Sequence, residues 1–292
     1  MYRGHQAAVA AGAGGVAQGY HPAEISMDVE FAELSDVGRV RQGNEDYLGH
    51  VIPASQEEVR VRGWFFAVAD GVGGHELGEV ASKTAVESVT AGFRECTAGE
   101  PHAGLLTRLV RNANTCVLDA AHSAGGMGGG SMATTIVACA LRYDRVTVAH
   151  VGDSRCYLIR RGQSNLLTRD HTVVNDQVRL RLLSKEEAAG SQNRHLLSRS
   201  LGSDLAVNVD VNEHQVFAGD VLVLCSDGLH GSVSGSEMAA LTSRGGDLAA
   251  AARRLVDIAN QRDGSDNISL QLIRVRSVER VGMYRGRPYR LP

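Results

Sequence analysis

Residues 64 to 82 read WFFAVADGVGGHELGEVAS, and this stretch carries the pattern that decides the fold. Trp64 to Ala69 are apolar throughout, as in a strand that is covered on both faces. The strand is expected to stop at Asp70, where the glycines that follow allow a backbone path that other residues resist. A carboxylate at such a position can approach a cation, with the neighbouring backbone carbonyl as a second oxygen donor. Asp-Gly is also common turn chemistry, so a turn that binds nothing is the alternative.

Further acidic residues occur in the same local setting, at the boundary between an apolar run and a turn. Asp153 lies between VTVAHV and CYLI, Asp227 comes shortly after VLVLC, and Asp266 shortly before ISLQLI. Glu45 and Asp46 form another acidic pair near the start of the fold. Carboxylates gathered at strand ends raise one another's pKa, and hard divalent cations remove that repulsion. All-oxygen ligands suit Mg²⁺ or Mn²⁺ rather than zinc. Spacing alone leaves a metal site and a set of turn aspartates equally open.

Composition limits the class of protein. A chain of 292 residues can build a substantial core, and its net charge of -3 and pI near 6.4 argue against a general nucleic-acid binder. No apolar run approaches the ~18 residues that a membrane helix needs. The five cysteines are dispersed, without a Cys-x-x-Cys pair, and most lie in apolar surroundings. Reduced core thiols of a cytoplasmic protein are therefore expected, and we expect a monomer that binds neither nucleic acid nor membrane.

Hydrophobic periodicity predicts the domain organisation. Residues 1–26 lack large apolar residues and are expected to be a disordered leader, residues 27–276 to be one domain, and residues 277–292 to be a basic C-terminal tail. The arginine-rich tail is either solvated or a docking segment for an acidic partner. Two groups of strands with paired helices between them predict a layered α+β domain. The expected strands are 27–34, a short strand that follows the polar turn in residues 39–52, 64–69, 132–141, 145–151, 155–160, 213–217, 221–225 and 267–275. The expected helices are 80–93, 105–120, 237–241 and 248–260.

Five motifs follow one another along the chain: RQGNED, VADGVGGH, VGDSR, LCSDGL and SDNISL. Their order and intervals resemble those of the metal-dependent protein phosphatases of type 2C, the PPM family, in its bacterial form. The resemblance extends from about Val29 to Val275. It implies a four-layer αββα sandwich, in which antiparallel helix pairs flank two packed antiparallel β-sheets and the metals lie in a cleft at one end.

The resemblance also implies a metal centre with two core ions, Mg²⁺ or Mn²⁺, and a third, weaker one. Asp70 would bridge the core ions, Asp227 and Asp266 would complete the ligands of the first, and Asp153 would belong with the third. The full set of implied ligands is Glu45, Asp46, Asp70, the carbonyl of Gly71, Asp153, Asp227 and Asp266.

The implied reaction is hydrolysis of phosphoserine or phosphothreonine by in-line attack of a metal-bridging hydroxide, without a phosphoenzyme. Arg41 matches the arginine that grips the substrate phosphate, which suits a guanidinium fork. A general acid would protonate the leaving alkoxide. Many eukaryotic relatives have a histidine where this chain has Val72, whereas bacterial relatives have one at the position of His75, so His75 is the candidate acid and a plain turn histidine is the alternative. His171 opens the segment that matches the family's flap, and we interpret it as structural or close to the substrate.

The sequence is compatible with three functions. The first is an active phosphatase that acts on phosphorylated proteins, opposing a bacterial serine/threonine kinase. The second is a catalytically weak pseudophosphatase that serves as a regulatory binding module; decayed members of the family usually lose metal aspartates, and all the acids named above are present. The third is a phosphatase that reactivates a phosphorylated anti-sigma antagonist, but such relatives commonly carry sensor domains and none is evident here.

Overall fold

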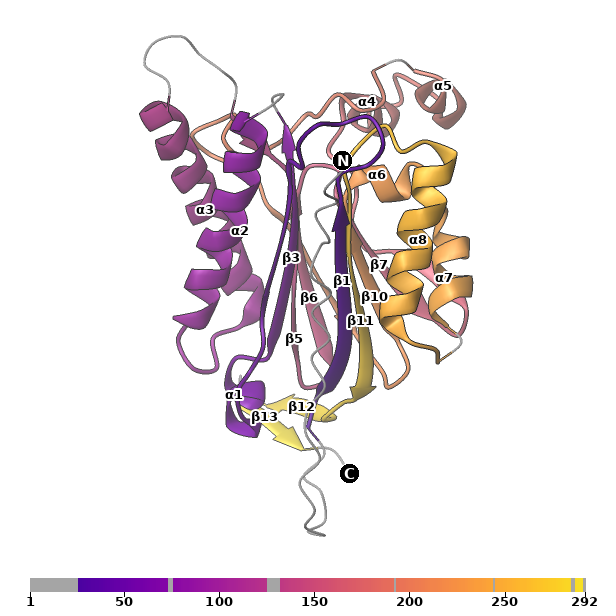
Figure 1. Cartoon of the computed structure of the whole chain (residues 1–292). Helices are drawn as coiled ribbons and strands as arrows, with labels where there is room; N and C mark the ends of the chain where they lie inside the picture. The colour runs from indigo at the N-terminus through magenta and orange to yellow at the C-terminus, as the bar shows by residue number, and fades with distance from the viewer. Residues whose placement is uncertain are drawn as a thin grey trace, which may run out of the picture.

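Two antiparallel β-sheets pack face to face in the computed structural model, which describes residues 26–72, 76–124, 132–191, 193–243, 245–284 and 287–290. Helices cover the outer face of each sheet (Figure 1). The first sheet has the order β1-β11-β10-β7-β8. Its strands are β1 (Asp28–Asp36), β7 (Arg155–Arg160), β8 (Gln163–Leu166), β10 (Val221–Cys225) and β11 (Ile268–Ser277).

The second sheet has the order β2-β3-β5-β6-β9, with β4 paired to the end of β3. Its strands are β2 (Asp46–Val51), β3 (Trp64–Val72), β4 (Ala133–Thr134), β5 (Ile136–Arg142), β6 (Arg145–Val151) and β9 (Asp210–Gln215). The expected α+β sandwich of two antiparallel sheets is confirmed.

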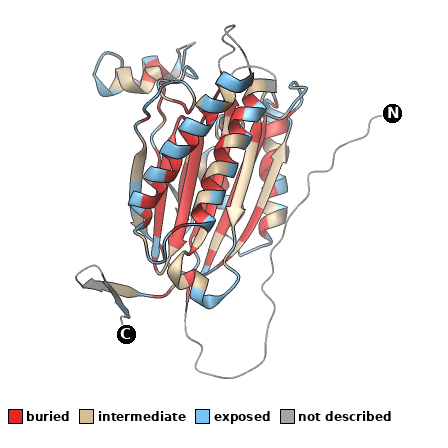
Figure 2. Cartoon of the chain, turned by 90° about the vertical axis from the view of Figure 1, so that its left-hand side faces the viewer, coloured by how far each residue is buried: buried red, intermediate tan, exposed pale blue. Residues whose placement is uncertain are grey.

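Two pairs of helices form the outer layers. Helices α2 (Glu76–Arg94) and α3 (His102–Ala124) pack together on the second sheet, and α7 (Gly235–Thr242) and α8 (Leu248–Arg262) lie on the first (Figure 1). In Figure 2, α2 and α3 face the viewer with an exposed outer side, and the buried strands lie behind them. None of the described helices is long and apolar enough to cross a membrane.

Strand β3 is buried on both faces, as its sequence predicts. Phe65 points toward the helices and stacks on Phe93 of α2 with a centroid distance of 4.7 Å. Phe66 points the other way and meets Phe31 of β1 edge to face at 5.2 Å, between the sheets. Each fully buried phenylalanine contributes about 1.5–3 kcal/mol. This strand therefore joins the core under the helices to the core between the sheets.

One end of the sandwich carries the short helices. Helix α6 (Asp227–His230) directly follows β10, and α4 (Val173–Arg179) and α5 (Lys185–Ala189) lie in the expected flap. Figure 1 shows all three at the same end of the two sheets. Helix α1 (Gln56–Val61) lies at the opposite end.

Several boundaries differ from the sequence-based expectations by a few residues, and three differences concern strand pairing. Strand β3 does not stop at Asp70, because the backbone of Gly71 and Val72 continues the ladder by pairing with β4. Strand β9 begins at Asp210 and ends at Gln215, earlier than expected at both ends, because its polar residues pair with the buried strand β6. The C-terminal segment, expected as a basic tail, contains two strands. These are β12 (Val281–Tyr284) and β13 (Arg287–Arg290), which pair as an antiparallel hairpin.

Candidate metal centre

The acidic residues singled out in the sequence come from both sheets and meet at the flap end of the sandwich. Asp46 opens β2 and lies directly opposite Asp70 of β3 in the antiparallel ladder. Asp227 begins α6 where β10 ends, Asp266 lies just before β11, and Asp153 lies in the connection between β6 and β7. Strand order thus brings together residues that are far apart in the sequence.

The electrostatics of Asp70 show how closely these acids gather. Burial raises the pKa of Asp70 well above its ordinary value, and nearby negative charges raise it further. Those charges belong to Asp46, Asp227, Asp153 and Asp266. A carboxylate surrounded in this way is stable as an anion only beside a cation.

Asp46 provides a direct test of whether a cation fits. Its side chain is buried, and its Oδ2 accepts a hydrogen bond of 2.7 Å from the Ser226 hydroxyl. Its Oδ1 is buried and has no hydrogen-bond partner among the described residues. Burial raises the pKa of Asp46 to about 7, although Ser226 acts against the shift. An unpartnered buried oxygen among carboxylates suits an oxygen-preferring divalent cation.

Asp153 and Asp227 form the second half of the cluster. Burial raises the pKa of Asp153 to about 7, and the charge of Asp227 adds to the shift. Burial also acts to raise the pKa of Asp227, but contacts with His195 and His230 outweigh it and lower that pKa overall. His195 comes from the flap, and its Nδ1 lies 3.7 Å from Asp227 Oδ2.

Neutral polar side chains hold the main chain of the acidic residues in place. Thr135 Oγ1 accepts the Asp70 N–H at 3.0 Å, and Thr134 Oγ1 donates to the Asp70 carbonyl at 2.8 Å. Asn267 Oδ1 accepts the Glu45 N–H at 2.8 Å, so the residue after Asp266 fixes the loop before β2. These groups fix the main chain and leave the carboxylates free to bind.

Glu45 lies against two glycines that leave no room for a side chain. A Cβ at Gly71 would lie 2.2 Å from the Gly78 carbonyl oxygen and 2.7 Å from that of Glu45. A Cβ at Gly78, in α2, would lie 2.6 Å from Glu45 Oε2. The Gly71 N–H also donates to the Glu45 carbonyl at 3.0 Å. The glycine after Asp70 is therefore needed for a close approach of three chain segments.

The remaining expected site residues have different positions. Arg41 lies at the mouth of the cluster, 44% exposed, and donates to Asp266 Oδ2 at 3.0 Å. His75, the candidate general acid, lies outside the described residues. His171 is buried at the base of the flap and contacts the backbone of Gly152 and the Asp210 carboxylate, which is not one of the expected metal ligands.

Several residues of the site had no signal that singled them out in the sequence. Ser226 and Asn267 lie in the quoted motifs LCSDGL and SDNISL, and Thr135 lies outside the five motifs, but no sequence pattern indicated the contacts that these three residues make. His230 Nε2 donates to the Asp153 carbonyl at 3.0 Å. His195 reaches Asp227 only because the flap folds back over the cleft, which periodicity does not reveal.

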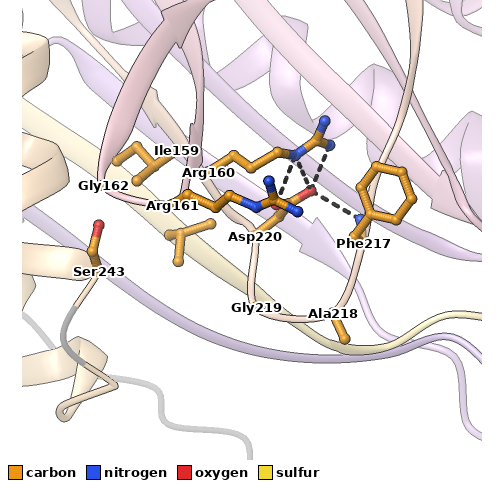
Figure 3. A pocket seen from close by; sticks show the side chains of 10 residues that line it. Ile159, Arg160, Arg161, Gly162, Phe217, Ala218, Gly219, Asp220 and Ser243 are labelled. Atoms are coloured by element: carbon orange, nitrogen blue, oxygen red, sulfur yellow. Dashed lines mark hydrogen bonds and ion pairs between the residues drawn. The ribbon is translucent and has the colours of Figure 1, made fainter.

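A cavity of about 560 Å³ lies at the opposite end of β7 and β10 from the acids (Figure 3). At its floor Arg160 donates to Asp220 at 2.7 Å, and its guanidinium carbon lies 4.6 Å from the centre of the Phe217 ring. None of the clustered carboxylates lines this cavity. The acid cluster, and not this cavity, is therefore the candidate functional site.

Comparison with known proteins identifies similar chains. A family model described as Protein phosphatase 2C matches residues 39–272. The chain is 34% identical over 264 residues to the serine/threonine phosphatase stp of Listeria innocua, covering 89% of this chain and 99% of that one. It is 31% identical over 249 residues to protein phosphatase PhpP of Streptococcus pneumoniae serotype 2, covering 84% and 97%.

Solved structures agree with these sequence relatives. The S. agalactiae serine/threonine phosphatase superposes with a TM-score of 0.76 at 31% identity, covering 85% of this chain and 100% of that one. The catalytic domain of the phosphatase PstP, solved with two manganese ions, gives a TM-score of 0.72 at 30% identity, covering 86% and 100%.

Proposed function

The chain belongs to the protein phosphatase 2C family, and from this premise we propose how its acids and its arginine carry out phosphate hydrolysis. It is a metal-dependent protein serine/threonine phosphatase. The observation that carries the proposal is the convergence of Asp46, Asp153, Asp227 and Asp266 on Asp70. Arg41 pairs with Asp266, but the buried Asp46 Oδ1 has no partner among the described residues, which suits a metal ligand.

We assign the metal ligands as follows. Asp70 would be shared by two core ions, and Asp227 and Asp266 would complete the ligands of the first. Glu45, Asp46 and the carbonyl of Gly71 would serve the second, with the two acids acting directly or through water. Asp153 would hold a third, weaker ion. Mg²⁺ and Mn²⁺ both suit oxygen ligands of this kind.

Bound cations would lower the pKa of a coordinated water and neutralise charge on the phosphate. The protein's own groups prepare the substrate. Arg41 turns from Asp266 to the phosphate, where its guanidinium fork binds two oxygens and orients the ester for in-line attack by water. The leaving serine or threonine oxygen takes a proton, for which His75 is the proposed donor.

The substrates are phosphoproteins. We propose that they are a bacterial serine/threonine kinase and its targets, and that the enzyme acts as a cytoplasmic monomer. Free cysteines at four buried positions support a reducing compartment. Residues 27–276 carry every proposed ligand and form the catalytic domain in this proposal.

Hydrolysis of p-nitrophenyl phosphate tests the function, measured with Mn²⁺, Mg²⁺ or a chelator. Turnover should require a divalent metal, and Asp227→Asn should lower kcat by about 100-fold or more because it removes ligand charge at the cluster. Asp257→Asn, on the exposed side of α8, is the matched control and should keep wild-type activity. A folded protein without turnover in either metal would favour the pseudophosphatase instead.

A further inference from the structure

A cluster of buried histidines lies beside the metal centre, on the far side of the Asp153 turn. His150 of β6 and His171, at the base of the flap, are each only 1% exposed. Their rings stack with a centroid distance of 4.7 Å and an interplanar angle of 15°. Asp210 of β9 pairs with His150 across the ladder, and its Oδ2 lies 3.3 Å from His171 Nε2.

The hydrogen bonds of His171 determine which ring nitrogen carries the proton. Its Nδ1 accepts the N–H of Gly152 at 3.2 Å, so this nitrogen bears a lone pair. Nε2 then carries the proton and faces the carboxylate of Asp210. Burial, together with the neighbouring His150, lowers the pKa of His171 to about 4, which keeps the ring neutral in this tautomer.

Two imidazoles and a carboxylate could also hold a metal ion, since one ligand atom from each lies within 4.8 Å of the others. Guanidinium groups already occupy the carboxylate. Arg199 donates to Asp210 Oδ1 at 3.0 Å, and Arg169 donates to Oδ2 at 3.0 Å. Arg199 Nη1 also lies 3.3 Å from His171 Nε2, but both nitrogens carry protons, so this contact is not a hydrogen bond. A divalent ion would have to enter beside two positive charges, so the arginines serve as the cations of this cluster.

Gly152 is held on two sides. Besides the contact to the imidazole, its carbonyl accepts the N–H of His171 at 2.9 Å. On the other side Thr135 lies so close that a Cβ at Gly152 would approach its side chain to 2.6 Å. Gly152 has a φ of +103°, which favours glycine, and Asp153 follows directly. The direction of Asp153 toward Asp70 and Asp227 depends on this clamped turn.

The same residue also ties down the flap. The His171 carbonyl accepts the N–H of Ser198 at 2.9 Å, and Thr172 bridges to Leu197. Both legs of the flap therefore meet at His171, and Arg199 on the returning leg closes the contact to Asp210.

We propose that the His171 side chain is a positioning residue of the metal centre, which accepts the Gly152 N–H and donates to Asp210, and thereby holds the Asp153 turn and the flap in register. The proposal rests on the proposed role of Asp153 as a ligand of the weaker metal ion. It assigns no contact between His171 and substrate or metal.

Two substitutions separate the two hydrogen bonds of His171. In His171→Asn, the amide oxygen lies near the place of Nδ1 and can accept from Gly152, but the side chain is too short to reach Asp210. In His171→Gln, the amide nitrogen can reach toward Asp210, but nothing accepts from Gly152. His102→Gln is the control, because His102 is similarly buried and bonds to the Arg62 carbonyl away from the acids.

The variants are compared by amide hydrogen exchange at Gly152 in metal-free protein and by calorimetric titration with Mn²⁺. His171→Gln should speed exchange of the Gly152 amide and weaken the weakest Mn²⁺ site by about 3- to 10-fold, the effect of one lost hydrogen bond. His171→Asn should stay close to wild type in both measurements, and so should His102→Gln.

Equal behaviour of His171→Asn and His171→Gln would overturn the proposal. Loss of one whole equivalent of bound Mn²⁺ in both variants would also overturn it, because the imidazole would then be a ligand. Failure of the proposed function is distinguishable: wild type would lack metal-dependent turnover, while the exchange at Gly152 would still test the hydrogen bond.

Discussion

The side chain of Glu45 fits against α2 because residue 78 of that helix is a glycine. Gly78 faces Glu45 Oε2 so closely that a methyl group there would push the carboxylate away. The two nearest atoms belong to the flexible end of the Glu45 side chain, and the Gly71 backbone carbon at 3.2 Å would have to move only slightly, so the position of Glu45 changes most. A substitution at Gly78 can therefore test whether Glu45 is a metal ligand.

Gly78→Ala should therefore separate metal binding from stability. Alanine favours the helix by roughly 0.5–1 kcal/mol, so the metal-free protein should melt near the wild-type temperature. If Glu45 lies beside a metal ion, the Mn²⁺ concentration for half-maximal activity should rise several-fold. Gly104→Ala in α3 is the control, because nothing lies within 4 Å of its added Cβ, and it should alter stability alone. Unchanged Mn²⁺ dependence in Gly78→Ala would remove Glu45 from the proposed ligands.

At the scale of single residues, the sequence indicated acids that lie together in the structure, but not the residues that surround them. Asp70, Asp153 and Asp227 lie in short motifs that contain both the acid and the residues of its turn. His195 and Ser226 contact these acids through the flap and across the sheets. Such contacts depend on tertiary packing, and one sequence carries no pattern for them.

At the scale of elements, periodicity indicated the buried strands and the long helices because their apolar residues repeat regularly. The predicted end of β3 was wrong. The strand continues through Gly71 because it pairs with β4, although glycine within a strand is unfavourable. The hairpin of β12 and β13 was missed because its arginines suggested a solvated tail. Pairing between two polar strands leaves only a weak sequence pattern.

Removing this hairpin tests whether it belongs to the catalytic domain. The segment leaves the sandwich beside α1, where Glu279 accepts from Arg60 Nε at 3.1 Å and donates its N–H to the Tyr143 carbonyl. Truncation after Ser277 should leave kcat and KM for p-nitrophenyl phosphate within about twofold, because the hairpin lies at the opposite end from the acids. The melting temperature should fall by several degrees, because truncation also removes the buried Glu279 and Val278, which packs against the core between the sheets. A large loss of kcat would make the hairpin part of the catalytic unit.

At the scale of the whole molecule, the sandwich brings carboxylates from both sheets to one edge, where they repel one another without metal. The folded metal-free protein should keep protons on Asp46 and Asp153, because burial raises the pKa of each to about 7. The unfolded chain releases the same protons near pH 4. Between about pH 4 and 7 the folded state therefore binds more protons, and each group makes folding less favourable as pH rises, on the order of 1 kcal/mol per pH unit.

Stability measured with and without Mn²⁺ should reflect this sign. Buried histidines with pKa near 4, such as His171 and His230, act in the opposite direction but are common to both conditions. The informative quantity is therefore the gain in unfolding free energy on adding Mn²⁺, which should grow from pH 5 to pH 7.5 as metal replaces protons. In Asp46→Asn the growth should be smaller. A gain that is independent of pH would show that these acids do not take up the metal.

The layered fold followed from the sequence because alternation and helical periodicity report directly on burial, and the motif order indicated the family. The register that places Asp46 opposite Asp70, and the clamp on Gly152, required the structure. Both arise from pairings between segments that are distant along the chain.

Anomalous scattering from crystals grown with Mn²⁺ is the most direct measurement of the central claim. The account predicts two strong peaks at the flap end of the sandwich, each within about 2.5 Å of an Asp70 carboxylate oxygen, with Asp227 and Asp266 completing one of them. A peak among His150, His171 and Asp210, with none beside Asp70, would contradict it.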